Sequence, residues 1–336
     1  MTAPPREAEI AAFLSRHGWG AARRLPLAGD ASFRRYERLV RGDERAVLMD
    51  APRPHEDVGP YLTVTGHLRR AGYSAPEVLA ADREAGLLLL EDLGDDLFTR
   101  LLTGGDAADE EDMYATAVDL LVDLHRRPAA ADLPPYDDAR LIAEADLLVD
   151  WYLPALDGGD VAPAAKARYR ELWRALFPVL DGLPRVLVLR DYHADNLIWL
   201  PERAGTARVG LLDFQDAVAG SPAYDLVSLL EDARRDVAAE LAEAMVRRYL
   251  AATGADETAF RTAYAVLGAQ RNAKIVGIFT RLWRRDGKSR YLDYLPRVWR
   301  LLEGDLAHPA LASMRAWFDR HIPVERRRRD LRGASA

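Results

Sequence analysis

Residues 189–196 of the chain read Leu-Arg-Asp-Tyr-His-Ala-Asp-Asn, and residues 211–216 read Leu-Leu-Asp-Phe-Gln-Asp. The first stretch begins at the end of an apolar run that is typical of a buried strand. The second ends a hairpin that the apolar pattern predicts over residues 197–212. Two acidic side chains, Asp191 and Asp213, are therefore predicted to end adjacent strands.

This set of residues suits phosphoryl transfer from a nucleotide, which needs a base directed at the acceptor hydroxyl and hard oxygen ligands for Mg²⁺. Asp191 is placed to take the hydroxyl proton, Asn196 to bind Mg²⁺, and Asp213 to be the main metal-binding carboxylate. A single acid after a strand is more often a turn former or a helix cap, but the ordered combination favours the catalytic interpretation. His193 is a supporting residue, and Asp225 either caps a helix or braces the loop.

The remaining pattern predicts an α+β chain with two lobes. Short apolar runs alternate with helical periodicity before residue 93, and helical periodicity dominates afterwards. The predicted division is residues 1–92, a nucleotide-binding lobe, 93–325, a catalytic and substrate lobe, and 326–336, a solvated, flexible basic tail. Outside the motif region, strands are expected at Ser32–Val40, Ala46–Asp50, Val78–Ala81 and Leu87–Leu90, and helices at Ala8–Arg16, Glu56–Ala71, Asp109–Arg127, Leu141–Tyr152, Ala162–Leu180, Ala223–Glu231, Val237–Thr253, Glu257–Arg284, Tyr291–Glu303 and Pro309–His321.

Composition excludes several other classes of protein. The 336 residues contain no cysteine, which removes disulfides, thiolate metal sites and a cysteine nucleophile. Lysine and arginine total 46 against 53 acidic residues, a net charge of −7, which argues against a general nucleic-acid binder. No apolar run reaches the length of a membrane helix and the start has no signal-peptide pattern, so a cytoplasmic protein is expected. The sequence carries no signal for an oligomeric state.

The motifs resemble those of the aminoglycoside phosphotransferase and choline kinase superfamily, small-molecule relatives of protein kinases. Looser stretches narrow the resemblance to the amino-sugar kinases that phosphorylate N-acetylmuramate and N-acetylglucosamine at the anomeric hydroxyl during peptidoglycan recycling. The resemblance covers about residues 5–322 and implies ATP and Mg²⁺ as cofactors. It also implies a protein-kinase-like bilobal fold, with a five-stranded antiparallel sheet and a helix in the first lobe. It rests on residues 191–196, 212–216 and 222–226, and on 29–36, 48–52, 270–272 and 291–292.

The resemblance also implies where the nucleotide binds. Residues 27–36 would form the loop over the phosphates, and residues 91–93 would form the hinge whose backbone meets adenine. The nucleotide-binding candidates are Gly29, Ser32, Phe33, Arg34, Arg35, Glu91, Asp92 and Leu93.

One departure from the family pattern concerns the phosphate-binding lysine of the third strand, because Met49 stands there and the first 165 residues contain no lysine. Arg34 or Arg35 could replace it, since a guanidinium binds phosphate oxygens in a bidentate fashion. Strand alternation directs one of them toward the cleft and the other away. A second departure is Leu189-Arg190, where the superfamily has His-Gly before the catalytic acid.

Acceptor recognition is predicted on the long helix after residue 257. Arg271, Lys274 and Arg281 could bind the lactyl carboxylate of N-acetylmuramate, although their helical spacing also fits a solvated face. Two alternatives stay open: another small-molecule kinase, acting on an aminoglycoside, choline or a homoserine-like alcohol, and a nucleotide-binding pseudokinase.

Overall fold

The computed structural model describes residues 6–27, 33–103, 107–159 and 161–334. The chain divides into two units, residues 1–106 with 195–216, and residues 107–194 with 217–336. The first unit therefore continues beyond residue 92 and takes in the segment after Ala194. The functional boundary expected at residue 92 stays a prediction.

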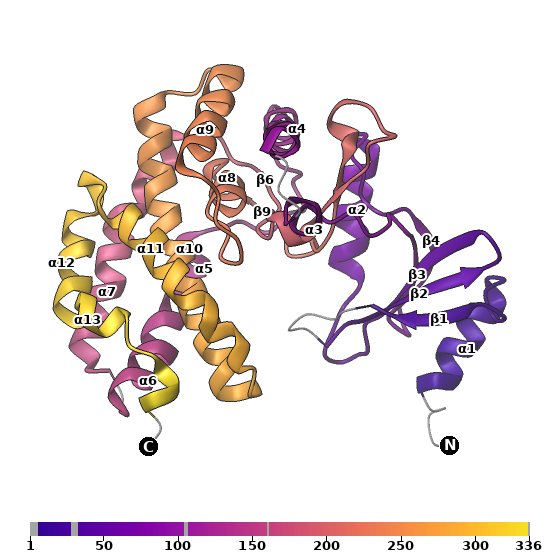
Figure 1. Ribbon diagram of the computed structural model, residues 1–336, viewed down its shortest axis with the longest axis horizontal. Helices are drawn as coiled ribbons and strands as arrows, with labels where there is room; N and C mark the ends of the chain where they lie inside the picture. The colour runs from indigo at the N-terminus through magenta and orange to yellow at the C-terminus, as the bar shows by residue number, and fades with distance from the viewer. Residues whose placement is uncertain (1–5, 28–32, 104–106, 160, 335–336) are drawn as a thin grey trace. The chain divides into compact units, whose positions relative to one another are not determined.

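A five-stranded antiparallel sheet forms the first unit, in the order β1-β2-β3-β5-β4 (Figure 1). The hairpins β2–β3 and β4–β5 agree with the predicted apolar runs, and the turn between β2 and β3 falls at Gly42-Asp43. The edge strand β1 was not predicted. The strands are β1 (Arg23–Pro26), β2 (Arg35–Arg41), β3 (Glu44–Asp50), β4 (Val78–Asp82) and β5 (Leu87–Glu91).

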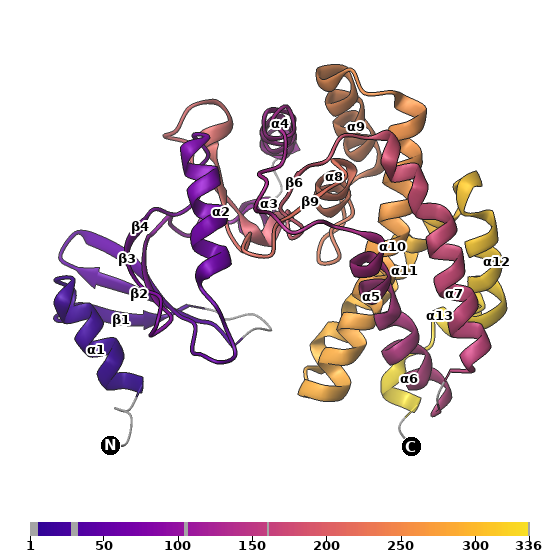
Figure 2. The same cartoon turned by 180° about the vertical axis from the view of Figure 1, so that it is seen from behind.

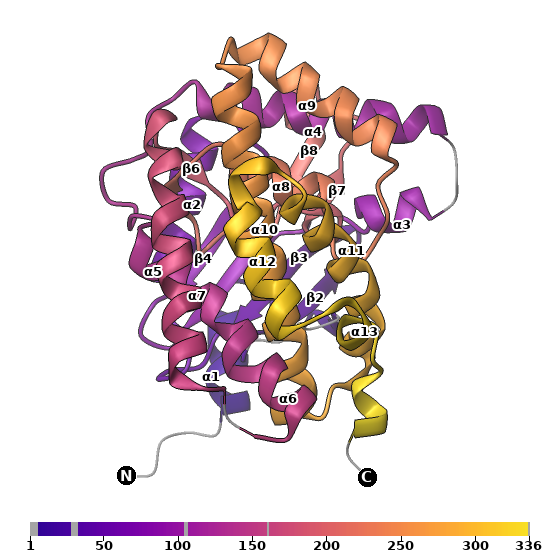
Figure 3. The same ribbon diagram turned by 90° about the vertical axis from the view of Figure 1, so that its left-hand side faces the viewer.

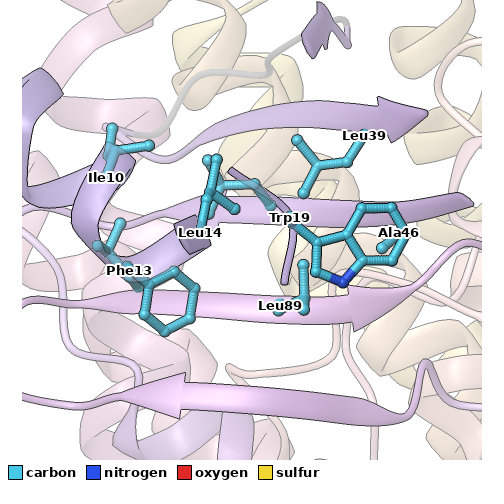
Figure 4. Packing of buried hydrophobic residues seen from close by; sticks show 9 residues of the cluster. Ile10, Phe13, Leu14, Trp19, Leu39, Ala46 and Leu89 are labelled. Carbon is cyan, nitrogen blue, oxygen red and sulfur yellow. The ribbon is translucent and has the colours of Figure 1, made fainter. Parts of the chain in front are cut away.

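Helix α1 (Arg6–Arg16) covers one face of this sheet. Its apolar side chains pack with Trp19 against Leu39, Ala46 and Leu89 of the strands (Figure 4). Because neighbouring residues of a strand point to opposite faces, the register pair Tyr36 and Met49 lies on the other face. The face opposite α1 therefore carries the residue that replaces the expected lysine.

The rest of the first unit follows the sheet. Helix α2 (Gly59–Arg70) is shorter than expected and ends before Gly72, as predicted. Strands β7 (Leu197–Trp199) and β8 (Val209–Leu211) form the predicted hairpin, which is bridged to Ser74 and Leu97 of the same unit. Short helical turns complete it: α3 (Phe98–Leu102), a 3-10 turn that ends at Asn196, and a 3-10 turn over Gly205–Arg208.

Helices form most of the second unit (Figures 2 and 3). The 30-residue helix α10 (Glu257–Asp286) runs through it beside α5 (Asp138–Leu147). Close approach requires Gly277, because a Cβ there would lie 2.2 Å from the carbonyl carbon of Leu147. The other helices are α4 (Ala107–His125), α6 (Leu153–Asp157), α7 (Pro163–Leu176), α8 (Ala223–Leu230), α9 (Ala239–Thr253), α11 (Leu295–Leu306), α12 (Ala312–His321) and α13 (Val324–Arg327).

Several predicted helices end in other helical types. A π-helical turn over Leu148–Tyr152 follows α5, and 3-10 turns over Phe177–Gly182, Ser289–Tyr294 and Pro309–Leu311 adjoin α7, α11 and α12. The predicted positions are otherwise close to the observed ones.

The strand pairing around Asp191 differs from the prediction. Strand β6 (Val186–Val188) pairs with β9 (Val218–Gly220), which the sequence did not reveal. The hairpin β7–β8 forms a sheet of its own. The prediction that Asp191 and Asp213 end adjacent strands is therefore wrong, because three-residue β9 takes the place beside β6.

The solvated arginine run expected at the end of the chain is also wrong for Arg327, which is 6% exposed. Its guanidinium pairs with Glu303 at 3.0 Å and Asp319 at 2.6 Å, so the positive charge is neutralised within the second unit. In the part of the chain that the structure describes, no helix is both long and apolar enough to span a bilayer.

Candidate active site

In the second unit, the loop that carries Asp191 is fixed through its backbone. The amides of Leu189 and Arg190 donate to the two carboxylate oxygens of Asp225 at 2.6 and 2.8 Å. Ser228 donates to the carbonyl oxygen of Arg190 at 3.1 Å. Asp225 is fully buried in the first turn of α8 and braces the loop, which is one of the two roles expected for it.

Arg190 has a φ of +70°, in the left-handed region where glycine is usual. This backbone conformation costs a residue with a side chain about 1–2 kcal/mol. The guanidinium pairs with the carboxylate of Glu144 and lies 5.5 Å from the centre of the Tyr136 ring. A strained arginine with a partly buried anionic partner therefore stands where the superfamily has the glycine of its His-Gly pair.

Positive charge surrounds the partly buried Asp191. Burial by itself would raise the pKa of this carboxyl, but the positive charges of Lys274, Arg190 and Arg271 outweigh that effect and hold its pKa below the usual value. Asp191 is therefore ionised at neutral pH, as a group that accepts a proton must be.

His193 is 5% exposed, and burial lowers its pKa, so the ring is neutral at pH 7. Its Nε2 lies 3.5 Å from a guanidinium nitrogen of Arg234, and its backbone amide donates to the carbonyl of Asp191 at 3.1 Å. The buried carboxylate of Asp232 accepts from the amide of Ala194 at 3.3 Å. These contacts support a loop-shaping role for His193.

In the first unit, the hairpin β7–β8 places Asn196 and Asp213 at the same end. Asn196 precedes β7, Asp213 follows β8, and the amide of Leu212 donates to the carbonyl of Asn196 at 3.0 Å. Asp213 has a φ of +56° and accepts from the side-chain amide of Gln215 at 2.9 Å. An amide oxygen and a carboxylate are hard donors of the kind that Mg²⁺ prefers, and Mg²⁺ binding by this pair stays a prediction.

Arg34 and Arg35 differ clearly in their surroundings. Arg35 is exposed, whereas Arg34 lies 3.4 Å from Asp213 and 3.8 Å from Glu56. Tyr36, two residues further on, shares the face of Arg34 and has a pKa that burial raises to about 12. The geometry favours Arg34 as the phosphate-binding residue. Glu56 was not predicted, because no motif marks it.

The other nucleotide-binding candidates give a mixed result. Gly29 and Ser32 lie outside the described residues, and Phe33 is 64% exposed. The carboxylates of the hinge are engaged in ion pairs, Glu91 with Arg203 at 2.7 Å and Asp92 with Arg38 at 2.6 Å. Leu93 is buried. Any contact with adenine would therefore come from the backbone of residues 91–93, which stays a prediction.

The three cations predicted on α10 are not equivalent. Arg271 and Lys274 are buried, so a solvated face is the wrong interpretation for them. Arg271 donates to Ser228 at 2.9 Å, and Lys274 lies 3.2 Å from Glu144. Arg281 is half-buried, and its Nε lacks a hydrogen-bond partner among the described residues. Burial and then the charge of Arg285 lower its pKa.

The fold, the residues around Asp191 and the residues around Asp213 are those of a kinase-like phosphotransferase. The chain belongs to the phosphotransferase enzyme family, whose model matches residues 23–262. The resemblance to the aminoglycoside phosphotransferase and choline kinase superfamily is thus confirmed.

Curated relatives carry one shared name. The chain is 44% identical to the N-acetylmuramate/N-acetylglucosamine kinase of Caulobacter vibrioides, over 96% of this chain and 98% of the relative. It is 38% identical to the enzyme of that name from Pseudomonas aeruginosa, over 88% and 89% of the two chains. These alignments extend over nearly the whole length of both chains.

Solved structures share the fold at low identity. A choline/ethanolamine kinase family protein from Mesorhizobium loti has a TM-score of 0.62 at 17% identity, covering 93% of this chain and 99% of the other. The ADP-bound aminoglycoside phosphotransferase APH(2'')-Ib has a TM-score of 0.63 at 15% identity, covering 88% and 97%. The predicted kinase-like fold is confirmed.

Proposed function

We propose that the protein transfers the γ-phosphoryl group of ATP to the anomeric hydroxyl of N-acetylmuramate and N-acetylglucosamine. The observation that carries the proposal is the ionised Asp191, held beside Lys274 on a braced loop. The names of the relatives supply the acceptors. The product would be a sugar 1-phosphate, made in the cytoplasm for peptidoglycan recycling.

Asp191 would orient the anomeric hydroxyl and take its proton as the oxygen attacks the γ-phosphorus. The new bond is between the sugar oxygen and phosphorus, and the bond that breaks is between the γ-phosphorus and the bridging oxygen, which leaves with ADP. Most of the rate enhancement in such transfers comes from positioning and charge stabilisation. Asp191 contributes position as well as basicity, because its loop is tied to Asp225.

The nucleotide would be held by residues of the first unit. Arg34 would bind phosphate oxygens in place of the lysine that Met49 replaces. Asn196 and Asp213 would hold Mg²⁺, which offsets phosphate charge when bound. The hinge backbone at residues 91–93 would meet the adenine.

The acceptor would be recognised in the second unit by cations of α10. Arg271 and Lys274 are engaged with protein groups, whereas no described residue accepts a hydrogen bond from the Nε of Arg281. Arg281 lies seven residues beyond Lys274, about 10 Å along the helix. We assign Arg281 to the lactyl carboxylate of N-acetylmuramate, which N-acetylglucosamine lacks.

The reaction is tested by ³¹P NMR of the protein with Mg-ATP and, in separate tubes, N-acetylmuramate, N-acetylglucosamine, kanamycin and choline. The expected result is a new phosphate signal coupled to the anomeric proton with the two amino sugars. Signal only with kanamycin or choline would contradict the acceptor assignment, and no transfer would favour the pseudokinase.

The acceptor contact is tested by Arg281→Met, with exposed Arg284→Met on the same helix as the matched control. Loss of one charged hydrogen bond should raise KM for N-acetylmuramate about 10-fold and leave KM for N-acetylglucosamine unchanged. An equal effect on both sugars, or none on either, would remove Arg281 from the site.

A further inference from the structure

The catalytic loop contains a strained residue whose side chain is used elsewhere. Arg190 adopts the left-handed conformation directly before Asp191. Its side chain is 14% exposed and pairs with Glu144, which lies on α5 and is 46 residues earlier in the chain. The strain of the turn and the position of Glu144 are therefore linked by one ion pair.

Glu144 has a second cationic partner. Lys274 of α10 lies 3.2 Å from Glu144 Oε2, and the hydroxyl of Tyr136 donates to the same carboxylate. The side chain of Glu144 is 13% exposed. Lys274 is the first among the charges that keep Asp191 ionised. One carboxylate thus joins the turn before Asp191 to the ammonium group beside it.

We propose that Glu144 is a positioning residue, whose carboxylate holds Arg190 in its left-handed turn and Lys274 beside Asp191. The inference rests on the proposed phosphoryl transfer, since it assigns a role in aligning the base for that reaction. Glu144 touches neither nucleotide nor acceptor in this scheme. In place of the flexible glycine of the superfamily's His-Gly pair, this chain has Arg190, which the ion pair with Glu144 fixes.

The neighbouring interactions explain why a neutral side chain would not suffice. Without the carboxylate, Arg190 and Lys274 would repel each other across a partly buried space, and each would have to find other partners. The backbone of Arg190 would keep its contacts with Asp225 and Ser228. The loop would therefore stay folded while the ammonium group and the turn lose their alignment.

The first test is Glu144→Gln, compared with Glu171→Gln, which removes a carboxylate from an exposed pair with Arg168 on α7. We expect kcat to fall about 10- to 100-fold with KM for ATP unchanged, because a small misplacement of the reacting groups is costly. Glu171→Gln should leave both unchanged. The proposal would be overturned if Glu144→Gln lowered the melting temperature enough to explain the lost activity. It would also be overturned if the Glu144→Gln variant were as active as the Glu171→Gln variant.

The second test uses glycine to release the strain. Arg190→Gly should lose less activity than Arg190→Ala, since glycine adopts a φ of +70° freely. The fall in kcat that Glu144→Gln causes should then be smaller by about fivefold or more in the Arg190→Gly background than in the wild-type background. Equal effects of Glu144→Gln in both backgrounds would show that Glu144 does not act through Arg190.

A third measurement does not depend on the reaction. Hydrogen–deuterium exchange of the peptide containing residues 189–193 should be faster in Glu144→Gln than in Glu171→Gln. If the wild type transfers phosphate to no acceptor, the proposed function fails, while this exchange result still decides the positioning role. Unchanged exchange together with unchanged kcat would reject the positioning role of Glu144 and leave the proposed function standing.

Discussion

Asp191 and Asp213 both follow a three-residue strand, yet their surroundings in the two units differ. Asp191 has charges on several elements around it, and its backbone neighbours are tied to Asp225. Asp213 has a side chain that is 32% exposed, with Arg34 at 3.4 Å and Gln215 at 2.9 Å. Asp191 is built into a fixed network, whereas Asp213 has contacts that can be exchanged.

The difference matches two kinds of chemical work. A base that accepts a proton benefits from a fixed position and a fixed charge. A carboxylate that binds an incoming metal and nucleotide must exchange one cationic partner for another. Arg34 would then move from Asp213 to the phosphates when the nucleotide enters.

The largest effect is expected for Asp191→Asn. An amide cannot take the hydroxyl proton, so kcat should fall about 10³-fold, while ATP binding stays near that of the wild type. A coupled ADP-release assay measures the first quantity and isothermal titration calorimetry the second. Full activity in this variant would show that Asp191 is not the base.

A smaller loss is expected for Asp213→Asn, and it should appear in a different parameter. Removing one anionic ligand should lower kcat/KM for Mg-ATP about 10²-fold. Titration with Mg²⁺ at fixed ATP should show a higher concentration for half-maximal rate. If kcat falls without any change in the Mg²⁺ requirement, Asp213 acts in some way other than metal binding.

The exchange of partners is tested by Arg34→Ala with Arg35→Ala as the matched control. Loss of charged hydrogen bonds to phosphate should raise KM for ATP about 10-fold in Arg34→Ala. Arg35→Ala should behave like the wild type, because this side chain is exposed and points to the other face. The reverse ranking would mean that Arg35 replaces the lysine.

The last effect concerns the stability of the fold and tests how burial acts on two carboxyls outside the candidate site. Asn272 donates to Glu231 at 2.7 Å and to Asp305 at 2.9 Å. Burial first, opposed by Asn272 and Arg271, raises the pKa of Glu231 to about 7, and the pKa of Asp305 is raised well above its ordinary value. Both carboxyls therefore keep a proton to a higher pH than an ordinary carboxyl does, unlike Asp191.

The sign of the pH dependence follows from the raised pKa of Glu231. In the unfolded chain Glu231 loses its proton near its ordinary pKa, but in the folded chain only near pH 7. Its contribution to stability is thus present below the unfolded pKa and lost as pH rises to about 7, on the order of 2 kcal/mol. Denaturant unfolding at pH 5 and pH 8 measures this loss.

Glu231→Gln provides the comparison, since glutamine cannot ionise and keeps an oxygen that accepts from Asn272. The variant should lose less stability than the wild type between the two pH values. His125, whose pKa burial lowers to about 3, acts in the opposite direction in both proteins and cancels in the difference. Identical pH slopes would show that Glu231 does not hold the proton.

Local sequence pattern was sufficient for most of the fold. Short apolar runs predicted β2, β3, β4 and β5, and helical periodicity predicted the long helices. It missed β1, whose sequence Arg-Arg-Leu-Pro has no apolar alternation, and β9, which has three residues. Pairing of β9 with β6 depends on contacts distant in sequence, and this is why the adjacent-strand prediction failed.

For the site, linear motifs located Asp191, Asn196 and Asp213 but not the groups around them. Glu56 and Glu144 lie outside these motifs, and their contacts with the cationic side chains near the candidate site appear only in the structure. Helical spacing could not distinguish buried Lys274 from a solvated lysine, because both occur at the same period. The residues that contact the motif residues could therefore be identified only from the structure.

The π-helical turn over Leu148–Tyr152 has a consequence for insertions and deletions. Its backbone bond, from the amide of Leu153 to the carbonyl of Leu148, encloses one residue more than an α-helical bond does. Deleting one residue there would restore an α-helix and rotate everything beyond it by about 100° relative to α5. Since α5 is fixed against α10 at Gly277, family members that keep this contact should keep the length of this segment to the single residue.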